Sequence, residues 1–305
     1  MKAQVIRWMT AVLMLAAMAL LISSPALAEV SPLPLDIKEH GYTPLKEGWS
    51  SNKVEYKDES IEVTYKNGSI KAKSSSTKVT TRMVTIRIAD PTQLRTTMSN
   101  ESYDDPRLAR ALAMAKSMEA VVACNGDFMK YSYDFGYVVR QGVLYRDALD
   151  GKRDILIIDD KGDFDYVLQA TSEMMAEKVA EIEADGRKII NSFSFGPVLV
   201  ADGVALDAHS AICSDNIATQ RIAIAQLDTL TYAIIEVDGG NGTGINIREL
   251  SNYIVRMFPD CKVAYNLDGG GSTHLIINGK KIHKTPNARP ISDIIYFASA
   301  QVPEE

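Results

Sequence analysis

Residues 265–274 of the chain read Tyr-Asn-Leu-Asp-Gly-Gly-Gly-Ser-Thr-His. An apolar run, Lys262 to Leu267, ends in the carboxylate of Asp268, and a second β-like run, Leu275 to Asn278, follows the glycines. Three consecutive glycines lose much conformational entropy on ordering, so a folded protein that keeps them needs bare backbone there. Bare backbone lets a ligand approach closely and can turn N–H groups toward an anion. Although Gly-Gly between strands is often a plain turn, the polar residues around it favour a ligand-binding loop.

Two further loops combine a carboxylate with glycine directly after a predicted strand. They are Asn125-Gly126-Asp127 and Asp238-Gly239-Gly240. An Asp-Gly pair alone is most often a turn, but three such loops in one chain point to a shared site. If the strand ends converge, the aspartates of the three loops line one cleft. Two arginines are the candidate cations for that cleft: Arg221, at the start of a predicted β-run, and Arg140, in a predicted hairpin.

One more glycine-rich segment does not match the common phosphate-binding motifs. Residues 240–244 read Gly-Asn-Gly-Thr-Gly between a strand and a helix. The spacing is not Gly-x-Gly-x-x-Gly and the preceding strand is predicted to be antiparallel, which excludes a Rossmann site. Ile245-Asn246 stands where a Walker A loop needs Lys-Ser/Thr. The chain also lacks an EF-hand loop, His-Glu-x-x-His, Cys-x-x-Cys and the Gly-x-Ser-x-Gly of many serine hydrolases.

Length and composition indicate an ordinary globular protein. The 305 residues, 46% hydrophobic and 24% charged, permit one large domain or two ordinary ones. The net charge of -6 argues against nucleic acid as a partner, because phosphate backbones need a basic face. An anionic ligand must therefore be bound by local positive groups.

Residues 1–28 have the pattern of a signal peptide. Lys2 and Arg7 precede an almost wholly apolar run, Trp8 to Ile22, and Ala26-Leu27-Ala28 is a small-x-small cleavage site. We predict cleavage near Ala28/Glu29, a secreted or cell-envelope protein, and no stable membrane span after cleavage. An uncleaved anchor is the alternative, because the apolar run approaches the lower length limit for spanning a bilayer.

The three cysteines are Cys124, Cys213 and Cys261. Their odd number and wide spacing predict neither a disulfide framework nor a zinc site. Cys124 and Cys261 lie in or beside apolar runs and are interpreted as small buried residues. A bridge between one pair remains open in an oxidising compartment.

The chain before the glycine loops is predicted to be rich in strands. Residues 29–60 are interpreted as an extended lead-in with little core of its own. Alternating apolar residues on either side of Asn67-Gly68 predict a β-hairpin of Ile61–Tyr65 and Ser69–Ala72. Phe193 to Val200 is interpreted as a single strand.

Helix signals are fewer. Asp104-Asp105-Pro106 predicts a helix start, because acids and proline favour the first turn. Asn246 with Glu249 three residues later predicts a capped helix.

Many strands with a few intervening helices predict the α+β class, with a mixed, largely antiparallel β-sheet body and flanking helices. We divide the chain into a signal peptide (1–28), a β-rich N-terminal extension with the hairpin (29–80) and one domain (81–305).

The three loops, in this order, resemble the phosphodiester glycosidase family, which has bacterial relatives of the exopolysaccharide-biosynthesis type. The resemblance extends from Met83 to Phe297 and is most specific in the run Asn266 to Thr273. The other matching segments are Ala123–Phe128, Phe195–Val200, Gln220-Arg221, Val237–Gly239, Gly244–Leu250 and Arg289–Asp293. The resemblance implies a mixed α/β fold and a hydrolase that cleaves sugar-1-phosphodiesters.

The residues fit that chemistry. Cleavage at the anomeric carbon passes through an oxocarbenium-like state. Because a phosphomonoester is a good leaving group, the site needs cations and backbone donors for the phosphate, and a carboxylate at the anomeric centre. Asp268 is the predicted nucleophile or base, with Asp127 or Asp238 as the second carboxylate. Substrate binding is assigned to Asn125, Arg221, Asn266, Gly269, Gly270, Gly271, Ser272, Thr273 and His274.

Two other functions stay open at this stage. One is a non-catalytic module that binds a phosphosugar or a cell-envelope polysaccharide without turnover. The other is a metal-dependent phosphodiesterase whose ions are held by Asp127, Asp238 and Asp268. The glycosidase interpretation predicts no cofactor, whereas the phosphodiesterase needs a divalent metal ion. The expected partner in each case is a phosphate-linked sugar or glycan.

Overall fold

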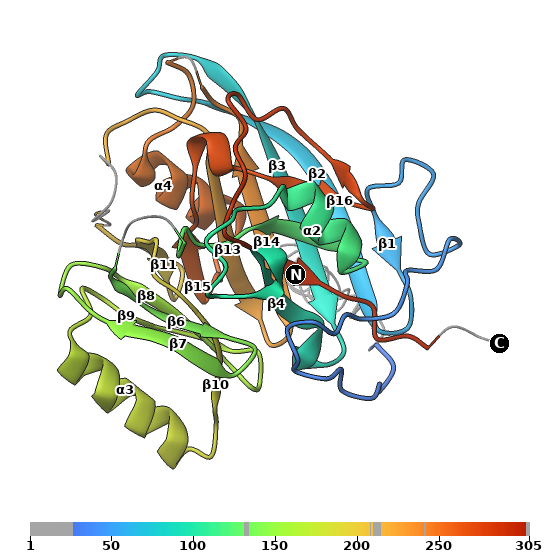
Figure 1. Ribbon diagram of the computed structural model, residues 1–305. Coiled ribbons are helices and arrows are strands. Elements are labelled where there is room, and N and C mark those ends of the chain that lie inside the picture. The colour runs from blue at the N-terminus through green and yellow to red at the C-terminus, as the bar shows by residue number, and fades with distance from the viewer. Residues whose placement is uncertain (1–26, 131–133, 208, 210–214, 241, 303–305) are drawn as a thin grey trace, which may run out of the picture.

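The computed structural model describes residues 27–130, 134–207, 209, 215–240 and 242–302 (Figure 1). Most of the predicted signal peptide, together with Cys213 and Asn241, lies outside the described residues. Every pairing between described strands is antiparallel. The predicted α+β class with a largely antiparallel sheet body is confirmed.

Two sheets form the body of the molecule. The eight-stranded sheet has, in spatial order, β1 (Tyr56–Lys57), β2 (Ile61–Lys71), β3 (Lys78–Ile88), β14 (Thr231–Val237), β13 (Arg221–Asp228), β15 (Val263–Asn266), β11 (Val198–Ala201) and β12 (Val204–Ala205). The five-stranded sheet has β17 (Lys280–Lys281), β16 (Leu275–Ile277), β5 (Val122–Asn125), β18 (Asp293–Phe297) and β4 (Leu94–Met98).

A smaller unit, at the lower left of Figure 1, carries the rest of the strands. It contains a three-stranded sheet of β10 (Ile189–Phe193), β8 (Ile155–Asp159) and β9 (Phe164–Val167), and a hairpin of β6 (Gly136–Arg140) and β7 (Val143–Ala148). The three α-helices of the described residues are α2 (Ala111–Ser117), α3 (Ser172–Ala184) and α4 (Ile247–Met257). Short 3₁₀ turns occur at η1 (Pro91–Gln93), η2 (Ser99–Glu101) and η3 (Gly270–Ser272).

The two large sheets pack face to face, with one helix on each outer face. In β5, Val122 and Cys124 lie in the core between the sheets, whereas Ala123 packs in the cluster that contains the α2 residues. This alternation is the period of two expected of a strand buried on both faces. Leu250 and Ile254 of α4 pack on the opposite face of the eight-stranded sheet. The result is a helix–sheet–sheet–helix arrangement, with α3 on the smaller unit (Figure 1).

The predicted hairpin at Asn67-Gly68 is wrong. Residues 61–71 form one continuous strand, in which Gly68 pairs with Thr81 of β3. A Cβ on Gly68 would lie 2.7 Å from Thr81 Oγ1 and 3.2 Å from the Tyr253 hydroxyl. The glycine therefore allows a close approach within the sheet, and the turn comes later, between Ala72 and Lys78. Strand β3 also crosses position 80, where the sequence suggested a domain boundary.

The predicted helix start at Asp104-Asp105-Pro106 is also wrong. Helix α2 begins at Ala111, with Arg110 as its N-cap residue. Asp105 instead accepts hydrogen bonds from the Arg107 side chain, at 2.5–3.1 Å. Asp105, which was expected to stabilise the N-terminus of a helix, forms a local ion pair with Arg107 instead.

The single strand expected over residues 193–200 is divided. Strand β10 ends at Phe193 in the smaller unit, and β11 starts at Val198 in the eight-stranded sheet. Ser194 to Pro197 links the two sheets, and the Ser194 N–H donates to Asp127. A continuous apolar run cannot show by itself that its two halves belong to different sheets.

The N-terminal lead-in has little regular structure but is fastened to the body. Leu33 and Tyr56 are buried in it. The fully buried Arg95 donates hydrogen bonds to the carbonyl oxygens of Pro34, Asp36 and Glu39, at 2.6–3.2 Å. Separately, no helix in the described part of the chain is long and apolar enough to cross a bilayer.

Candidate active site

The ends of strands β13 and β15 position Asp268. The register pairs Ala223 with Asn266, and the Leu267 N–H donates to the Ile222 carbonyl at 3.0 Å. Asp268 therefore comes to lie beside the start of β13, at an edge where the eight-stranded sheet meets the five-stranded one. Asp268 is buried: 5% of the residue's surface is exposed.

The three glycines after Asp268 are explained by close packing and by one turn. A Cβ on Gly269 would lie 2.9 Å from the Gln220 carbonyl oxygen, and one on Gly271 would lie 2.6 Å from that of Asn287. Gly270 has φ +56°, in the left-handed region that favours glycine. The loop therefore needs residues without side chains, as the sequence predicts. The immediate reason is that it packs closely against the backbone of Gln220 and Asn287.

Several N–H groups of the loop are already used. Gly270 donates to the Gln220 carbonyl at 3.0 Å, and Ser272 and Thr273 donate back to Gly269 and Gly270, both at 3.1 Å. The last two of these bonds close the η3 turn, and the first joins the loop to the residue that precedes β13. The N–H groups of Gly270, Ser272 and Thr273 are therefore not available to an anion. The sequence-based expectation that the glycine backbone binds an anion does not hold for these three donors.

Arg289 faces the Asp268 carboxylate. Its Nη2 lies 3.1 and 3.3 Å from the two carboxylate oxygens, and its Nε donates to Ser272 Oγ at 2.6 Å. The arginine side chain is 48% exposed, whereas that of Asp268 is 8% exposed. Burial raises the pKa of Asp268, and Ser272 and Arg289 oppose this shift. The pair thus combines a buried carboxylate with a cation that reaches solvent.

Asp127 is the second carboxylate of this place. It follows β5, is buried, and accepts hydrogen bonds from the N–H groups of Phe128 at 2.8 Å and Ser194 at 2.6 Å. Its negative charge contributes to the raised pKa of Asp268, so the two carboxylates are close enough to interact. Two of the three predicted acids are therefore brought together.

Asn125 joins the two loops. Its Nδ2 donates to the Asp268 carbonyl at 2.7 Å, and its Oδ1 accepts from the His274 N–H at 2.9 Å. Asn266 is also buried, and donates to the Gly196 carbonyl at 2.7 Å. Both asparagines hold backbone segments at the site.

Asp238 lies in a separate ion-pair cluster. It accepts from Arg82 Nη1 at 2.7 Å, and the same atom contacts Glu236 at 2.7 Å. In the order β14–β13–β15, Asp238 follows β14 and Asp268 follows β15, so two strand spacings, about 10 Å, separate these strand ends. Asp127 and Asp268 thus lie near each other, whereas Asp238 is held in its own ion pairs; that all three acids line one cleft stays a prediction.

The predicted cations serve as supports. Arg221 is buried and donates to the carbonyls of Ile217 at 2.9 Å and Ile245 at 3.4 Å. Arg140 is fully buried and paired with Asp293, whose pKa is raised to about 6 by burial. Arg221 thus holds two backbone segments together, and Arg140 holds Asp293, whose carbonyl accepts the Gly126 N–H at 3.1 Å.

His274 is packed. Its Nε2 lies 3.4 Å from the Arg289 carbonyl oxygen and its Nδ1 lies 3.5 Å from Thr285 Oγ1. Burial lowers the pKa of His274 to about 4, so the ring is neutral near pH 7. A neutral, buried imidazole supports the loop and is no source of positive charge for a phosphate.

Sequence reasoning missed three residues of this region. Arg289 begins the segment Arg289–Asp293 that resembles the family, but the sequence alone does not single it out as a cation of the site. Glu236 and His283 had no signal beyond their place in or near apolar runs. Glu236 is fully buried and burial raises its pKa to about 7; His283 Nε2 lies 3.9 Å from its carboxylate.

The described residues contain no group of three or more His, Cys, Asp or Glu side chains that could hold a metal ion. The ligand set proposed for a metal-dependent phosphodiesterase, Asp127, Asp238 and Asp268, is therefore not assembled. Cys124 and Cys261 are free thiols, and both are buried as predicted.

A two-sheet α+β scaffold that brings two carboxylates together at its strand ends suits a hydrolase of glycosidic bonds. More narrowly, the chain belongs to the phosphodiester glycosidase family, whose model matches residues 118–298. The resemblance inferred from the loops, and the enzyme class that it implied, are confirmed at the level of the family.

One curated protein is similar to part of the chain. The chain is 30% identical over 183 residues to the SPbeta prophage-derived uncharacterized protein YomE of Bacillus subtilis strain 168. The aligned region covers 56% of this chain and 26% of that protein. The chain thus spans about a quarter of the length of this relative.

Two solved structures share the fold. The zebrafish N-acetylglucosamine-1-phosphodiester alpha-N-acetylglucosaminidase catalytic domain, auto-inhibited by its pro-peptide, aligns with a TM-score of 0.61 and 17% identity, over 78% of this chain and 83% of that one. A hypothetical protein from Synechocystis aligns with a TM-score of 0.52 and 14% identity, over 77% of this chain and 61% of that one.

Proposed function

We propose that the protein is a secreted hydrolase that cleaves the bond between a sugar and its 1-phosphate in a phosphodiester-linked glycan. The observation that carries the proposal is the buried Asp268 carboxylate, with Asp127 close by and the half-exposed Arg289 guanidinium at 3.1 Å. Family membership supplies the class of bond.

In this proposal Asp268 acts at the anomeric carbon. Asp127 accepts one backbone hydrogen bond on each oxygen, which fixes the position of its carboxylate. A fixed negative charge beside Asp268 stabilises the positive charge that develops on the sugar ring. Asp268, whose pKa is raised, is the better group to take a proton from water or to attack the anomeric carbon.

The phosphate is assigned to Arg289. A guanidinium presents a planar fork of donors that matches two phosphate oxygens. Arg289 reaches solvent, while Ser272 fixes its Nε and so aims the remaining donors. Ser272 and Thr273 are fully buried, so in this proposal they and the glycine loop hold Arg289 in position through its bonds to Ser272 Oγ and the Gly271 carbonyl, with Arg221 as a further support.

The reaction breaks the bond between the anomeric carbon and the bridging oxygen. The oxygen of water forms the new bond to carbon, its proton passes to the carboxylate, and the phosphomonoester leaves with the bridging oxygen. Solvent labelled with ¹⁸O would therefore appear in the sugar, whereas a phosphodiesterase would place it in the phosphate.

Release of free sugar from a panel of sugar-1-phosphate methyl diesters tests the proposal. We expect turnover by the full chain and a loss of at least about a hundredfold in Asp268→Asn, because a neutral amide can neither attack nor accept the proton. Asp228→Asn, at a surface aspartate that is 79% exposed, is the matched control and should keep full activity. Equal turnover in Asp268→Asn and the control would remove Asp268 from the mechanism. Retention of the diester without turnover would identify a binding module.

A further inference from the structure

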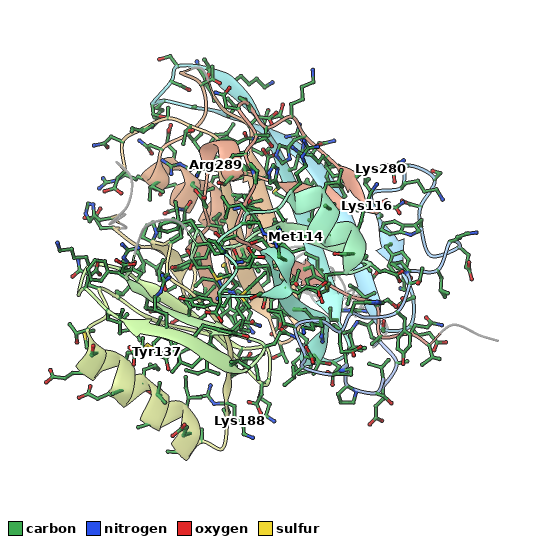
Figure 2. The ribbon with its side chains drawn as sticks, in the orientation of Figure 1. Met114, Lys116, Tyr137, Lys188, Lys280 and Arg289 are labelled. Carbon is green, nitrogen blue, oxygen red and sulfur yellow. The ribbon has the colours of Figure 1, made fainter. Side chains whose placement is uncertain are left out.

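A second hollow lies at the far end of strands β5 and β16 from the candidate active site. His274 precedes β16 and Asn278 follows it, so about 13 Å of extended chain separates the two positions. The hollow has a volume of about 230 Å³ and is formed by the N-terminal lead-in, the end of α2 and the turn after β16. Figure 2 labels Lys116 near this hollow and Arg289 at the candidate active site, and the two are well apart in that view.

Trp49 supplies an aromatic wall. It is half-buried, with its ring centroid 4.7 Å from that of Tyr56 and the two planes inclined at 51°. No described residue accepts a hydrogen bond from its indole N–H. An aromatic ring of this kind offers a ligand an apolar face together with one polar donor. Trp49 is also the sole tryptophan of the described residues, since the other one in the chain is Trp8.

Polar groups surround that aromatic wall. The Glu119 carboxylate accepts a hydrogen bond from the Thr43 hydroxyl across the hollow. The Lys116 stem packs over Gly279, where a Cβ would lie 3.4 Å from Lys116 Cε. The side-chain amide of Asn278 has no hydrogen-bond partner among the described residues. Acceptors and donors thus occur on the same rim.

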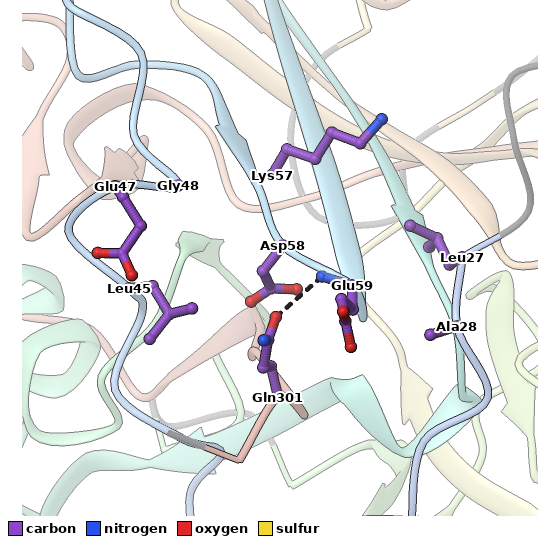
Figure 3. A pocket seen from close by; sticks show the side chains of 9 residues that line it. All are labelled: Leu27, Ala28, Leu45, Glu47, Gly48, Lys57, Asp58, Glu59 and Gln301. Atoms are coloured by element: carbon purple, nitrogen blue, oxygen red, sulfur yellow. Dashed lines mark hydrogen bonds between the residues drawn. The ribbon is translucent and has the colours of Figure 1, made fainter. Parts of the chain in front are cut away.

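A larger cavity nearby is less suited to a ligand. It has a volume of about 480 Å³ and is lined by Asp58, Glu59 and Gln301, among others (Figure 3). Its described lining contains no aromatic side chain, and two of its polar groups are engaged: Asp58 Oδ1 accepts from the N–H groups of Ser60 and Ile61, and Gln301 Oε1 accepts from the Glu59 N–H at 2.9 Å. The hydrogen bond between Glu59 and Gln301 joins the N-terminal part of the chain to its C-terminal segment at this cavity.

We propose that the Trp49 hollow is a second carbohydrate-binding site, which takes one sugar ring of the glycan on which the enzyme acts. A sugar ring has an apolar C–H face, which suits the indole, and a rim of hydroxyl groups, which suits Glu119, Asn278 and Lys116. The volume lies below the roughly 300–1,000 Å³ of sites for drug-sized ligands, so it fits a single ring and not an oligosaccharide. The choice of a glycan rests on the proposed function, whereas the hollow and its lining do not.

Trp49 emission gives a direct test that does not depend on turnover. In the full chain with Trp8→Phe, Trp49 is the sole tryptophan, so its fluorescence reports on this hollow. The probes are maltose, N,N′-diacetylchitobiose and, as the anion control, inorganic phosphate. We expect a saturable change in emission with at least one of the two disaccharides and none with phosphate.

A matched variant tests the rim. Asn278 has φ +52°, a conformation that glycine adopts freely, so Asn278→Gly removes the amide without straining the backbone. We expect Asn278→Gly to weaken disaccharide binding by roughly three- to tenfold, the loss of about one hydrogen bond. Asp268→Asn should bind the disaccharide with unchanged affinity.

Different results would reject the second binding site and the proposed reaction. A response to phosphate alone, no saturable response to either sugar, or equal sugar affinity in Asn278→Gly would each overturn the second site. Sugar binding that persists in a protein without glycosidase activity would keep this site and reject the proposed reaction.

Discussion

At the scale of single residues, exposure decides which arginine can meet a substrate. Arg221 and Arg140 are buried and donate hydrogen bonds to carbonyl or carboxylate groups. Their positive charge is therefore compensated inside the protein. Arg289 is half-exposed and lies directly over Asp268. A fully buried charge costs free energy unless it is paired, which is why the two buried arginines act as structural supports.

The first prediction concerns Arg289. Arg289→Lys keeps the charge but loses the planar fork that can contact Ser272 and a phosphate at once. We expect kcat/KM for a sugar-1-phosphate diester to fall at least about tenfold, measured by release of free sugar. Arg248→Lys, at an arginine that is 73% exposed, is the control. Unchanged kcat/KM in Arg289→Lys would mean that the phosphate binds elsewhere.

The second prediction follows from the raised pKa of Glu236. Burial raises this pKa from 4.5 to about 7, against the opposing effects of Gln220 and Arg82. The folded protein therefore binds a proton here more tightly than the unfolded chain does. The stability that this proton contributes is fully present below pH 4.5 and is lost as the pH rises through 7.

Glu236→Gln removes that titration. Relative to the variant, the wild type should lose stability between pH 4.5 and 7.5, on the order of 3 kcal/mol at full extent, since one pKa unit corresponds to 1.36 kcal/mol. Urea unfolding at several pH values measures the difference. Glu177→Gln, at an exposed position of α3, should show no such trend. A pH-independent difference between wild type and Glu236→Gln would contradict the raised pKa.

At the scale of elements, local signals succeed where the neighbours of a segment do not matter. The capping box of Asn246 and Glu249 forms at the start of α4, as its spacing predicts. The hairpin of β6 and β7 turns at Gln141-Gly142, where both residues have positive φ. Gly68 shows the limit of such signals, because the same Asn-Gly pair lies inside a strand when a partner strand approaches closely.

The third prediction tests the role of Gly68. Gly68→Ala places a methyl group 2.7 Å from Thr81 Oγ1, so we expect a loss of about 1–3 kcal/mol in the free energy of unfolding. In the Thr81→Ala background that clash is absent, so the same substitution should cost less. A double-mutant cycle by urea unfolding measures the coupling. Additive effects would show that Gly68 is required for some other reason.

At the scale of the whole molecule, the site exists because two sheets meet. Asp268 follows a strand of the eight-stranded sheet and Asp127 follows one of the five-stranded sheet, and the side chain of Asn125 bridges their loops. The smaller unit adds the Ser194 N–H, which holds Asp127. Loops distant in sequence are thus made neighbours by the packing of three separate sheets.

The fourth prediction concerns the lead-in. Arg95→Ala removes the donors that hold the carbonyls of Pro34, Asp36 and Glu39, so residues near these positions should become sensitive to limited proteolysis. Cleavage sites are mapped by mass spectrometry of native protein. Arg107→Ala, at an exposed arginine that bonds only locally to Asp105, is the control. Equal protection of the lead-in in both variants would show that other contacts fasten it.

The amino-acid sequence is enough to predict the class of fold, most strand and helix positions, the family, and Asp127 and Asp268 as candidate acids. These features depend on local periodicity, capping and loop composition, which are written in neighbouring residues. Three features become visible only in the folded protein: Asp238 belongs to another ion-pair cluster, Arg289 and not Arg221 faces solvent over Asp268, and Gly68 lies in a strand. Each of these depends on contacts between segments far apart in the chain, and burial and charge pairing there have no local signature.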